Sequence, residues 1–296
     1  MTQADGFLSV LRNAQPSDVV VDPYPFLVVN DAIPTDICDA LIARYPSLDI
    51  LGKDSNQNNS RWSVPAWDVS QNAAIEGVWK EMVAYHASAA FFDDFVRVFG
   101  DHVVRLYPTY FPDLESLRAM RLGVRERDSF DDHDLLLDAQ ISGNTQVRDA
   151  SSVKTIHIDS EHKLFTGLLY LRSPADDSIG GDLDVFRFRR DLTMAQRRRR
   201  YDGMFIDDAF VEPVTRIPYH RNTLVMFING PDALHGVTVR QPTPHLRLFM
   251  NLVGETRVKL FDVPQHWQTR LAKIPRLIKK RLRRVAGLTP QREREY

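Results

Sequence analysis

The chain has 296 residues and a formal net charge of −1 at pH 7, so its overall charge gives no reason to expect nucleic-acid binding. Hydrophobic residues make up 43% and aromatic residues 10% of the sequence, which is too apolar for a disordered protein. No apolar run approaches the roughly 20 residues of a membrane span, the first residues lack a secretory-signal pattern, and the single cysteine cannot form an internal disulfide. We therefore expect a cytoplasmic protein that binds no nucleic acid and has no transmembrane segment.

The first part of the chain predicts one strand followed by helices. Residues 24–30 form a short β-branched and aromatic run, and residues 35–42 place apolar side chains at helical spacing before Pro46. A polar, turn-rich segment at 51–62 predicts a loop. Residues 70–99 carry an apolar stripe that is typical of two helices packed on a core.

From about residue 135 the periodicity changes to short segments rich in Val, Ile, Phe and Tyr, separated by turn signals. The predicted strands lie at 138–142, 153–158, 164–171, 182–188, 214–218, 223–228, 236–240 and 246–253. No long helix is predicted between them. This pattern favours a mainly β fold, an antiparallel barrel or jelly roll, with the earlier helices packed outside it.

Two segments are strongly basic. An insertion at 189–213 contains Arg197–Arg200, and we interpret it as a surface loop or short helix, with a substrate-contacting lid as the alternative. Residues 264–286 carry many cations and no acid, and their apolar side chains fall near one face. We expect a basic helix docked through this apolar stripe; contact with an anionic membrane surface is the alternative.

These patterns divide the chain into three parts. An N-terminal strand and helices occupy 1–134, the β-rich core occupies 135–256, and the basic C-terminal helical tail occupies 257–296. We expect the three to form one integrated domain, with the N-terminal strand and helices packed on the core.

A candidate metal site begins at His157-Ile158-Asp159, near the end of a predicted strand. Alternate residues of a strand share a face, so this imidazole and this carboxylate converge on one point. His235 stands at the start of another predicted strand, which closure of a barrel would bring close. Two histidines and one carboxylate leave coordination positions open, as in non-haem Fe(II) oxygenases, whereas a closed zinc site has a fourth protein ligand. Other histidines compete as ligands: His102, His133, His162, His220, His245 and His266.

The surroundings of these residues resemble the Fe(II)/2-oxoglutarate-dependent oxygenase superfamily, especially its prolyl-hydroxylase-like branch. The likeness covers about residues 138–254. After His157-x-Asp159 it rests on Gly167-Leu-Leu-Tyr-Leu-Arg172, Gly180-Gly-Asp-Leu183, Leu234-His-Gly-Val237 and Arg247-Leu-Phe-Met-Asn-Leu252. The resemblance implies a double-stranded β-helix core (a cupin-like jelly roll). It also implies Fe(II) held by His157, Asp159 and His235, with O2 and 2-oxoglutarate as cosubstrates.

The resemblance also suggests residues that hold 2-oxoglutarate. In the family a basic residue that opens the last strand grips the distal carboxylate, and Arg247, twelve residues after His235, matches it. A planar guanidinium suits this role because it binds a carboxylate through two hydrogen bonds. Tyr170 corresponds to a hydroxyl that contacts the same carboxylate, and Asn251 shares a strand face with Arg247 and is a further donor. Arg240 is the competing candidate.

The expected reaction is hydroxylation with decarboxylation of 2-oxoglutarate to succinate. Related halogenases carry a small residue where this chain has Asp159, so the carboxylate favours hydroxylation. We expect a small-molecule substrate: an amino acid, a natural-product intermediate or a sugar-linked compound. The alternatives are a protein or peptidyl-prolyl hydroxylase and a non-catalytic metal-binding barrel that acts as a binding module.

Overall fold

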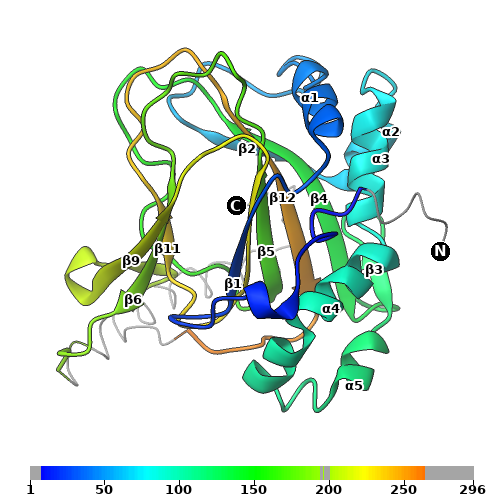
Figure 1. Cartoon of the computed structure of the whole chain (residues 1–296), viewed down its shortest axis with the longest axis vertical. Coiled ribbons are helices and arrows are strands. Elements are labelled where there is room, and N and C mark those ends of the chain that lie inside the picture. Colours follow the sequence, from blue (N-terminus) through cyan, green and yellow to red (C-terminus); the bar gives the residue numbers. More distant parts are fainter. Residues whose placement is uncertain (1–7, 194–195, 197–200, 264–296) are drawn as a thin grey trace, which may run out of the picture.

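The computed structural model describes residues 8–193, 196 and 201–263 (Figure 1). The basic run Arg197–Arg200 and the helix expected at 264–286 lie outside the described residues. In the part of the chain that is described, no helix is long and apolar enough to cross a membrane. The fold is mainly β, with two largely antiparallel sheets facing each other and helices covering the outer side of the larger sheet (Figure 1).

The larger sheet has the strand order β1-β10-β5-β12-β4-β2, and the short β3 lies parallel to β4. Its strands are β1 (Phe26–Asn30), β2 (Arg61–Val64), β3 (Leu122–Val124), β4 (Leu135–Asn144), β5 (Lys163–Tyr170), β10 (Thr223–Ile228) and β12 (Arg247–Thr256). The early strands β1 and β2 therefore lie within this sheet, paired with β10 and β4. The loop predicted at 51–62 is wrong at its end, because Arg61 already pairs with β4.

The smaller sheet has the order β11-β6-β9, with β6 (Leu183–Phe188), β9 (Val211–Ile217) and β11 (His235–Val237). The strand predicted at 153–158 is wrong as a continuous strand. His157 makes isolated bridges to His235 on one side and to Phe205 on the other, and the ladder extends no further. The strand predicted at 236–240 ends at Val237. Thr238 still donates its N–H to the carbonyl of Asp182, but the N–H of Asp182 donates to the side-chain Oγ1 of Thr238 instead of its carbonyl, so the ladder stops there.

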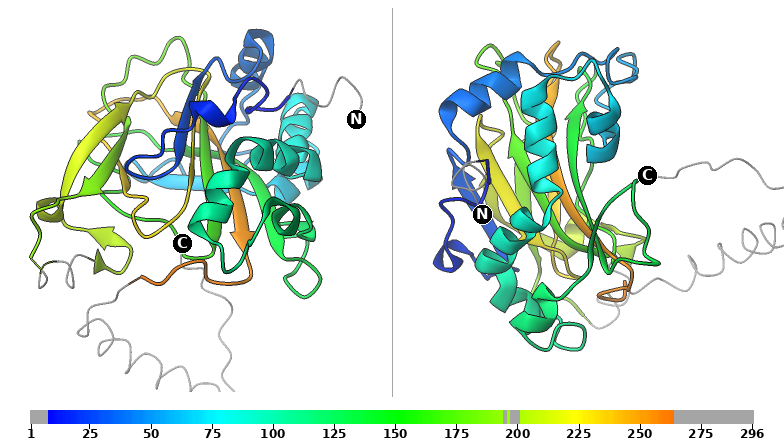
Figure 2. Two further views of the ribbon diagram at one scale, coloured as in Figure 1. Left: turned by 60° about the horizontal axis from the view of Figure 1, so that its bottom comes forward. Right: turned by 90° about the vertical axis from the view of Figure 1, so that its right-hand side faces the viewer.

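The helices are α1 (Thr35–Ala43), α2 (Ala66–Gln71), α3 (Gly77–His86), α4 (Ala89–Leu106) and α5 (Leu114–Arg118), with short 3-10 turns η2 (Pro16–Asp18) and η3 (Asp208–Phe210). These five α-helices are layered on one side of the larger sheet (Figure 2). The helix pair predicted at 70–99 is confirmed as α3 and α4. Phe95 of α4 packs on Phe165 of β5 with ring centroids 4.4 Å apart, so this layer closes an apolar core.

The two faces of the larger sheet differ in chemistry. Leu137, Leu169 and Leu252 face the helices and belong to the main apolar core. The residues that alternate with them face the smaller sheet, and on β4 and β12 many of these are buried polar side chains: Asp138, Gln140, Ser142, Asn144, Arg247 and Asn251. Burying polar groups costs free energy unless they find partners, so this inner face is where a functional site is to be sought.

Candidate functional site

The three predicted metal ligands meet between the sheets. Their ligand atoms lie within 4.8 Å of one another, and His157, Asp159 and His235 are only 3%, 6% and 5% exposed. Reciprocal backbone hydrogen bonds of 2.9 and 3.0 Å join His157 to His235, which brings the ring centroids to 4.2 Å. A single bridge between His157 and His235 therefore brings the two histidines together, whereas the sequence predicted that two full strands would do so.

Both imidazole rings are oriented by backbone carbonyl groups. Nδ1 of His157 lies 2.6 Å from the carbonyl oxygen of Thr155, and Nδ1 of His235 lies 3.0 Å from that of Ala233. With Nδ1 donating, Nε2 keeps its lone pair for a metal. Burial lowers the pKa of His157 well below its usual value and that of His235 to about 4. Both rings are thus neutral at pH 7, the form that binds metal.

Asp159 is held in place by three side chains. Thr166 donates from Oγ1 to Oδ2 of Asp159 at 2.8 Å and accepts from Nδ2 of Asn229 at 3.1 Å. Lys154 and Lys163 contact the two carboxylate oxygens at 3.2 and 3.4 Å. Burial acts to raise the pKa of Asp159, but the two lysines and two histidines outweigh it, so the pKa lies well below its usual value. Asp159 is therefore an anion.

The donor set suits a metal that keeps open coordination positions. Oδ1 of Asp159 lies 3.7 Å from Nε2 of His157. Bonds of about 2.1 Å to one metal ion would place adjacent ligand atoms about 3.0–3.4 Å apart, so the three side chains would move closer together around a bound ion. Within the described residues, no fourth histidine, cysteine or carboxylate joins the group. Two imidazoles and one carboxylate on one side of an ion fit a non-haem iron site better than a closed structural zinc site.

Arg247 lies on the same inner face, at the start of β12. It donates from Nε to the carbonyl of Gly181 at 2.8 Å and from Nη1 to Oδ1 of Asn144 at 3.4 Å. Its Nη2 is buried and has no hydrogen-bond partner among the described residues, and the same holds for the hydroxyl of Tyr170. The guanidinium carbon lies 4.8 Å from the centroid of the Tyr170 ring. Burial raises the pKa of Tyr170 and Arg247 acts to lower it, so the two groups lie close together, and neither meets a carboxylate or carbonyl acceptor at these atoms among the described residues. A carboxylate could accept from both.

A glycine turn shapes the wall beside Arg247. Gly180 and Gly181 have φ values of +82° and +84°, and a Cβ on Gly180 would lie 1.9 Å from the carbonyl oxygen of Val239. Only glycine lets the backbone pass this closely and turn the carbonyl of Gly181 toward Arg247. The Gly-Gly motif of the sequence is thus needed to present the Gly181 carbonyl to Arg247.

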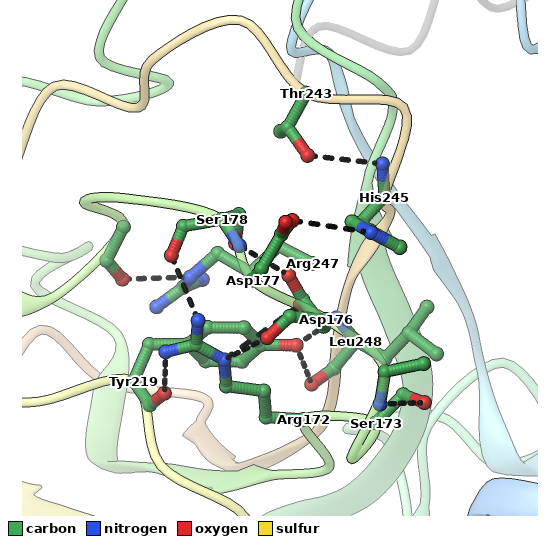
Figure 3. A network of polar contacts seen from close by, with 12 residues as sticks. Arg172, Ser173, Asp176, Asp177, Ser178, Tyr219, Thr243, His245, Arg247 and Leu248 are labelled. Atoms are coloured by element: carbon green, nitrogen blue, oxygen red, sulfur yellow. Dashed lines mark hydrogen bonds and ion pairs between the residues drawn. The ribbon is translucent and has the colours of Figure 1, made fainter.

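The segment that leads into this turn is tied down by another arginine. Arg172 donates to the carbonyl groups of Asp176, Ser178 and Tyr219 at 3.0, 2.8 and 3.2 Å (Figure 3). The Tyr219 hydroxyl in turn accepts from the backbone N–H of Leu248 at 2.8 Å, next to Arg247. The network fixes the surroundings of Arg247 and leaves its Nη2 unused.

Arg240, the competing candidate, has a different environment. Its Nη1 donates to Oδ1 of Asn59 and to the carbonyl of Thr145, both at 3.0 Å, and its Nη2 donates to the carbonyl of His245 at 2.9 Å. Both terminal nitrogens are therefore used to join loops. This favours Arg247 as the carboxylate-binding residue.

Asn251 lies on the inner face of β12 as expected, but its amide is occupied. Nδ2 donates to Oε1 of Gln140 at 2.7 Å, and Gln140 donates on to Oδ2 of Asp138 at 2.7 Å. Oδ1 of Asn251 has no partner in the described part of the chain, and it is an acceptor. A role for Asn251 as a donor to a cosubstrate stays a prediction.

Several contributors were missed by the sequence analysis. Thr166 stands four residues before Tyr170 on the same strand face, so the alternation of β5 could have identified it. Lys154 and Lys163 flank the His-x-Asp triplet and carry no pattern that separates them from surface lysines. The other described histidines do not join the ligand group; His266 lies outside the described residues.

Part of the insertion at 189–213 touches the ligand segment. Ile158 donates its N–H to the carbonyl of Met204 at 2.9 Å, and Ile206 donates to that of Ile156 at 3.0 Å. These bonds place the hairpin of β7 (Tyr201–Asp202) and β8 (Phe205–Ile206) against the His157 backbone, with the Phe205 ring 6.1 Å from that of His157. The insertion therefore contacts the candidate site.

Comparisons with known proteins give structural neighbours only. No family model matches the chain, and no curated protein matches it. The chain is similar to a prolyl-4-hydroxylase of Pseudomonas putida, with a TM-score of 0.45 and 13% identity over 82% of this chain and 98% of that one. It is also similar to a prolyl 4-hydroxylase of Phytophthora capsici (TM-score 0.43, 16% identity, 95% and 74% covered). A third neighbour is a 2OG-Fe(II) oxygenase family oxidoreductase of Burkholderia pseudomallei (TM-score 0.39, 12% identity, 79% and 85% covered).

Proposed function

We propose that the protein is an Fe(II)- and 2-oxoglutarate-dependent dioxygenase that hydroxylates a small molecule. The observation that carries this proposal is the combination of a three-ligand group with a buried, partly unpaired Arg247 on the same inner face. A metal-binding module without catalysis would account for the three ligands alone. It would not account for a guanidinium N–H and a tyrosine hydroxyl buried without acceptors among the described residues, since each costs about 1–3 kcal/mol.

The order of the strands supports a double-stranded β-helix core. Along the chain, β4, β5, β10 and β12 of the larger sheet alternate with segments that pair in the smaller sheet, namely the His157 bridge, β6 with β9, and β11. Each crossing returns the chain to the opposite sheet, as in a jelly roll. In this arrangement the crossing segments deliver ligands to the space between the sheets.

We assign different residues to metal binding, to cosubstrate binding and to orientation of a metal ligand. His157, Asp159 and His235 would hold iron, which when bound supplies the activation of O2 coupled to decarboxylation of 2-oxoglutarate. Arg247 and Tyr170 would grip the distal carboxylate of 2-oxoglutarate, where burial strengthens the ion pair by excluding water. Thr166 orients Asp159 through its 2.8 Å hydrogen bond.

A small-molecule substrate is favoured by the burial of the ligands, since each is no more than 6% exposed. An enclosed site with a few converging polar groups suits a small molecule. Peptide hydroxylation is the second candidate, and one observation favours it. A groove of about 520 Å³ lies between the edge strands β1 and β9, lined in part by Phe26, Val28 and Ile217. Strand edges of this kind accept extended peptides.

Anaerobic titration tests the proposal. Adding 2-oxoglutarate to the Fe(II)-loaded protein should produce a visible charge-transfer absorption band, as the family resemblance implies, and His157→Ala should lack it. Succinate formation in air, screened over small molecules and proline-containing peptides, then separates the two substrate classes. A wild-type protein that binds Fe(II) but gives no such band would contradict the oxygenase proposal.

A further inference from the structure

Arg61 is a cation on the inner face that the proposed reaction has not used. It opens β2, at the edge of the larger sheet, and pairs with Asn144 of β4. The strand alternation sends its neighbour Trp62 into the core beneath the helices. The guanidinium of Arg61 instead lies over Phe249 of β12, with its carbon 5.3 Å from the ring centroid.

Arg61 and Arg247 share this ring. The guanidinium carbon of Arg247 lies 5.1 Å from the Phe249 centroid, so the aromatic ring contacts both cations. The contact of a guanidinium with a ring is favourable by about 0.5–2 kcal/mol, but two like charges on one ring repel each other. An anion bound next to both cations would relieve this repulsion, so the pair is expected at an anion-binding site.

The Arg61 guanidinium has no acceptor among the described residues. Its side chain makes no hydrogen bond and no ion pair there, although it is accessible to solvent. Surrounding protein nevertheless lowers the pKa of Arg61; Asp159 raises it and Arg247 lowers it further. The guanidinium thus lies within electrostatic reach of both the metal ligand and the cosubstrate arginine, and it stays protonated at any physiological pH.

The nearby carboxylate of Asp159 is already engaged. Its two oxygens contact Lys154 and Lys163, and Thr166 holds one of them as well. The terminal nitrogens of Arg240 show how a structural arginine of this protein is engaged, through acceptors on Asn59, Thr145 and His245. Apart from its contact with the Phe249 ring, the Arg61 side chain has neither kind of partner among the described residues, which distinguishes it from Arg240.

We propose that Arg61 binds a carboxylate of the primary substrate, so that the enzyme selects carboxylate-bearing small molecules. The inference rests on the proposed function, because it takes Arg247 as the residue that holds 2-oxoglutarate. A planar guanidinium binds a carboxylate through two parallel hydrogen bonds, which fixes orientation as well as position. Arg61 is then a specificity-determining residue that holds the substrate within reach of the metal.

A paramagnetic probe tests this without knowledge of the substrate. Protein loaded with Mn(II) and saturated with 2-oxoglutarate is mixed with trifluoroacetate, and the 19F relaxation of the probe is measured against that of neutral trifluoroacetamide. We expect relaxation of the anion to exceed that of the amide by about tenfold, because only the anion binds beside the metal. Arg61→Gln should abolish the difference, Arg61→Lys should keep part of it, and the matched exposed control Arg105→Gln should retain it in full.

Two results would overturn the inference. Equal relaxation in wild type and in folded Arg61→Gln would show that the anion does not bind at Arg61. A loss of 2-oxoglutarate affinity in Arg61→Gln as large as in Arg247→Gln, measured calorimetrically with Mn(II), would assign Arg61 to the cosubstrate instead. Failure of wild type to bind 2-oxoglutarate would contradict the proposed function alone, since the change in trifluoroacetate relaxation between wild type, Arg61→Gln and Arg247→Gln with Mn(II) as the only other ligand still reports on Arg61.

Discussion

The two faces of the larger sheet are built from the same strands but differ in composition: one is apolar and the other carries buried polar groups. The face toward the helices is almost wholly apolar and is closed by aromatic packing such as that of Phe95 on Phe165. The face toward the smaller sheet carries four buried polar groups without partners among the described residues, on Asn144, Tyr170, Arg247 and Asn251. On the helix-facing side of these strands the described residues contain one such group, Nε1 of Trp62.

The difference shows that the inner face, which carries the unpaired polar groups, contributes less to folding stability than the outer face. Unpaired buried donors destabilise a fold by about 1–3 kcal/mol each, and the apolar layer on the other face offsets that loss. If the unpaired groups exist to bind ligands, substitutions on the inner face should reduce binding and leave folding largely intact. Substitutions on the outer face should do the reverse.

The largest effect is expected from His157→Ala. Removing one of three metal ligands should abolish metal binding and turnover to background, because the remaining pair cannot hold the ion firmly. The unfolding temperature of the metal-free protein should change little. Metal content by elemental analysis, succinate formation and thermal unfolding are the three measurements. Retention of metal at wild-type affinity would remove His157 from the ligand set.

On the outer face, Phe95→Ala is expected to destabilise the fold. Phe95 is fully buried and packs on Phe92, Phe99 and Phe165, so its loss should lower the free energy of unfolding by about 3–5 kcal/mol. Binding of Mn(II) by the fraction that stays folded should be unchanged. Urea unfolding and calorimetry check the two parts. A large drop in metal affinity under conditions where Phe95→Ala is fully folded would show that the outer face also affects the metal site, contrary to this prediction.

The separation of the faces could be predicted from the sequence only in part. Alternation identified β4, β5, β10 and β12, and the resemblance selected His157, Asp159 and His235 from nine histidines and many carboxylates. The strand expected at 153–158 failed because local periodicity says nothing of pairing, and that segment finds partners only at single residues.

The features that could not be predicted from the sequence depend on long-range contacts. Spacing alone could not separate Arg240 from Arg247; the difference lies in which acceptors each nitrogen meets, and those acceptors come from distant segments. Arg61 fell inside a segment predicted as a loop, because its place in β2 depends on pairing with Asn144. Neither fact has a signature in the neighbouring sequence.

Arg247→Gln should weaken 2-oxoglutarate binding without loss of metal. Removing one partner of a buried charge pair costs about 2–5 kcal/mol, so the concentration of 2-oxoglutarate needed should rise by roughly 30-fold or more. The matched control is Arg240→Gln, which should lower the unfolding temperature by freeing acceptors on Asn59, Thr145 and His245 but leave cosubstrate affinity nearly unchanged. Calorimetric titration with Mn(II) present compares them. If Arg240→Gln had the larger effect on affinity at equal folding, the cosubstrate role would move to Arg240.

The smallest effect is expected at Thr166, which contacts the proposed metal ligand Asp159. Thr166→Val keeps the shape but removes the hydroxyl that donates to Oδ2 of Asp159 and accepts from Asn229. Partners that orient a metal ligand typically contribute 10–100-fold in affinity, so Mn(II) should bind about that much more weakly, while 2-oxoglutarate affinity at saturating metal should hold. Thr166→Ser keeps the hydroxyl and should recover most of the affinity. Equal weakening in Thr166→Val and Thr166→Ser would mean that the methyl contact, and not the hydrogen bond, positions Asp159, and the inner face would then be an extension of the apolar packing found on the other side.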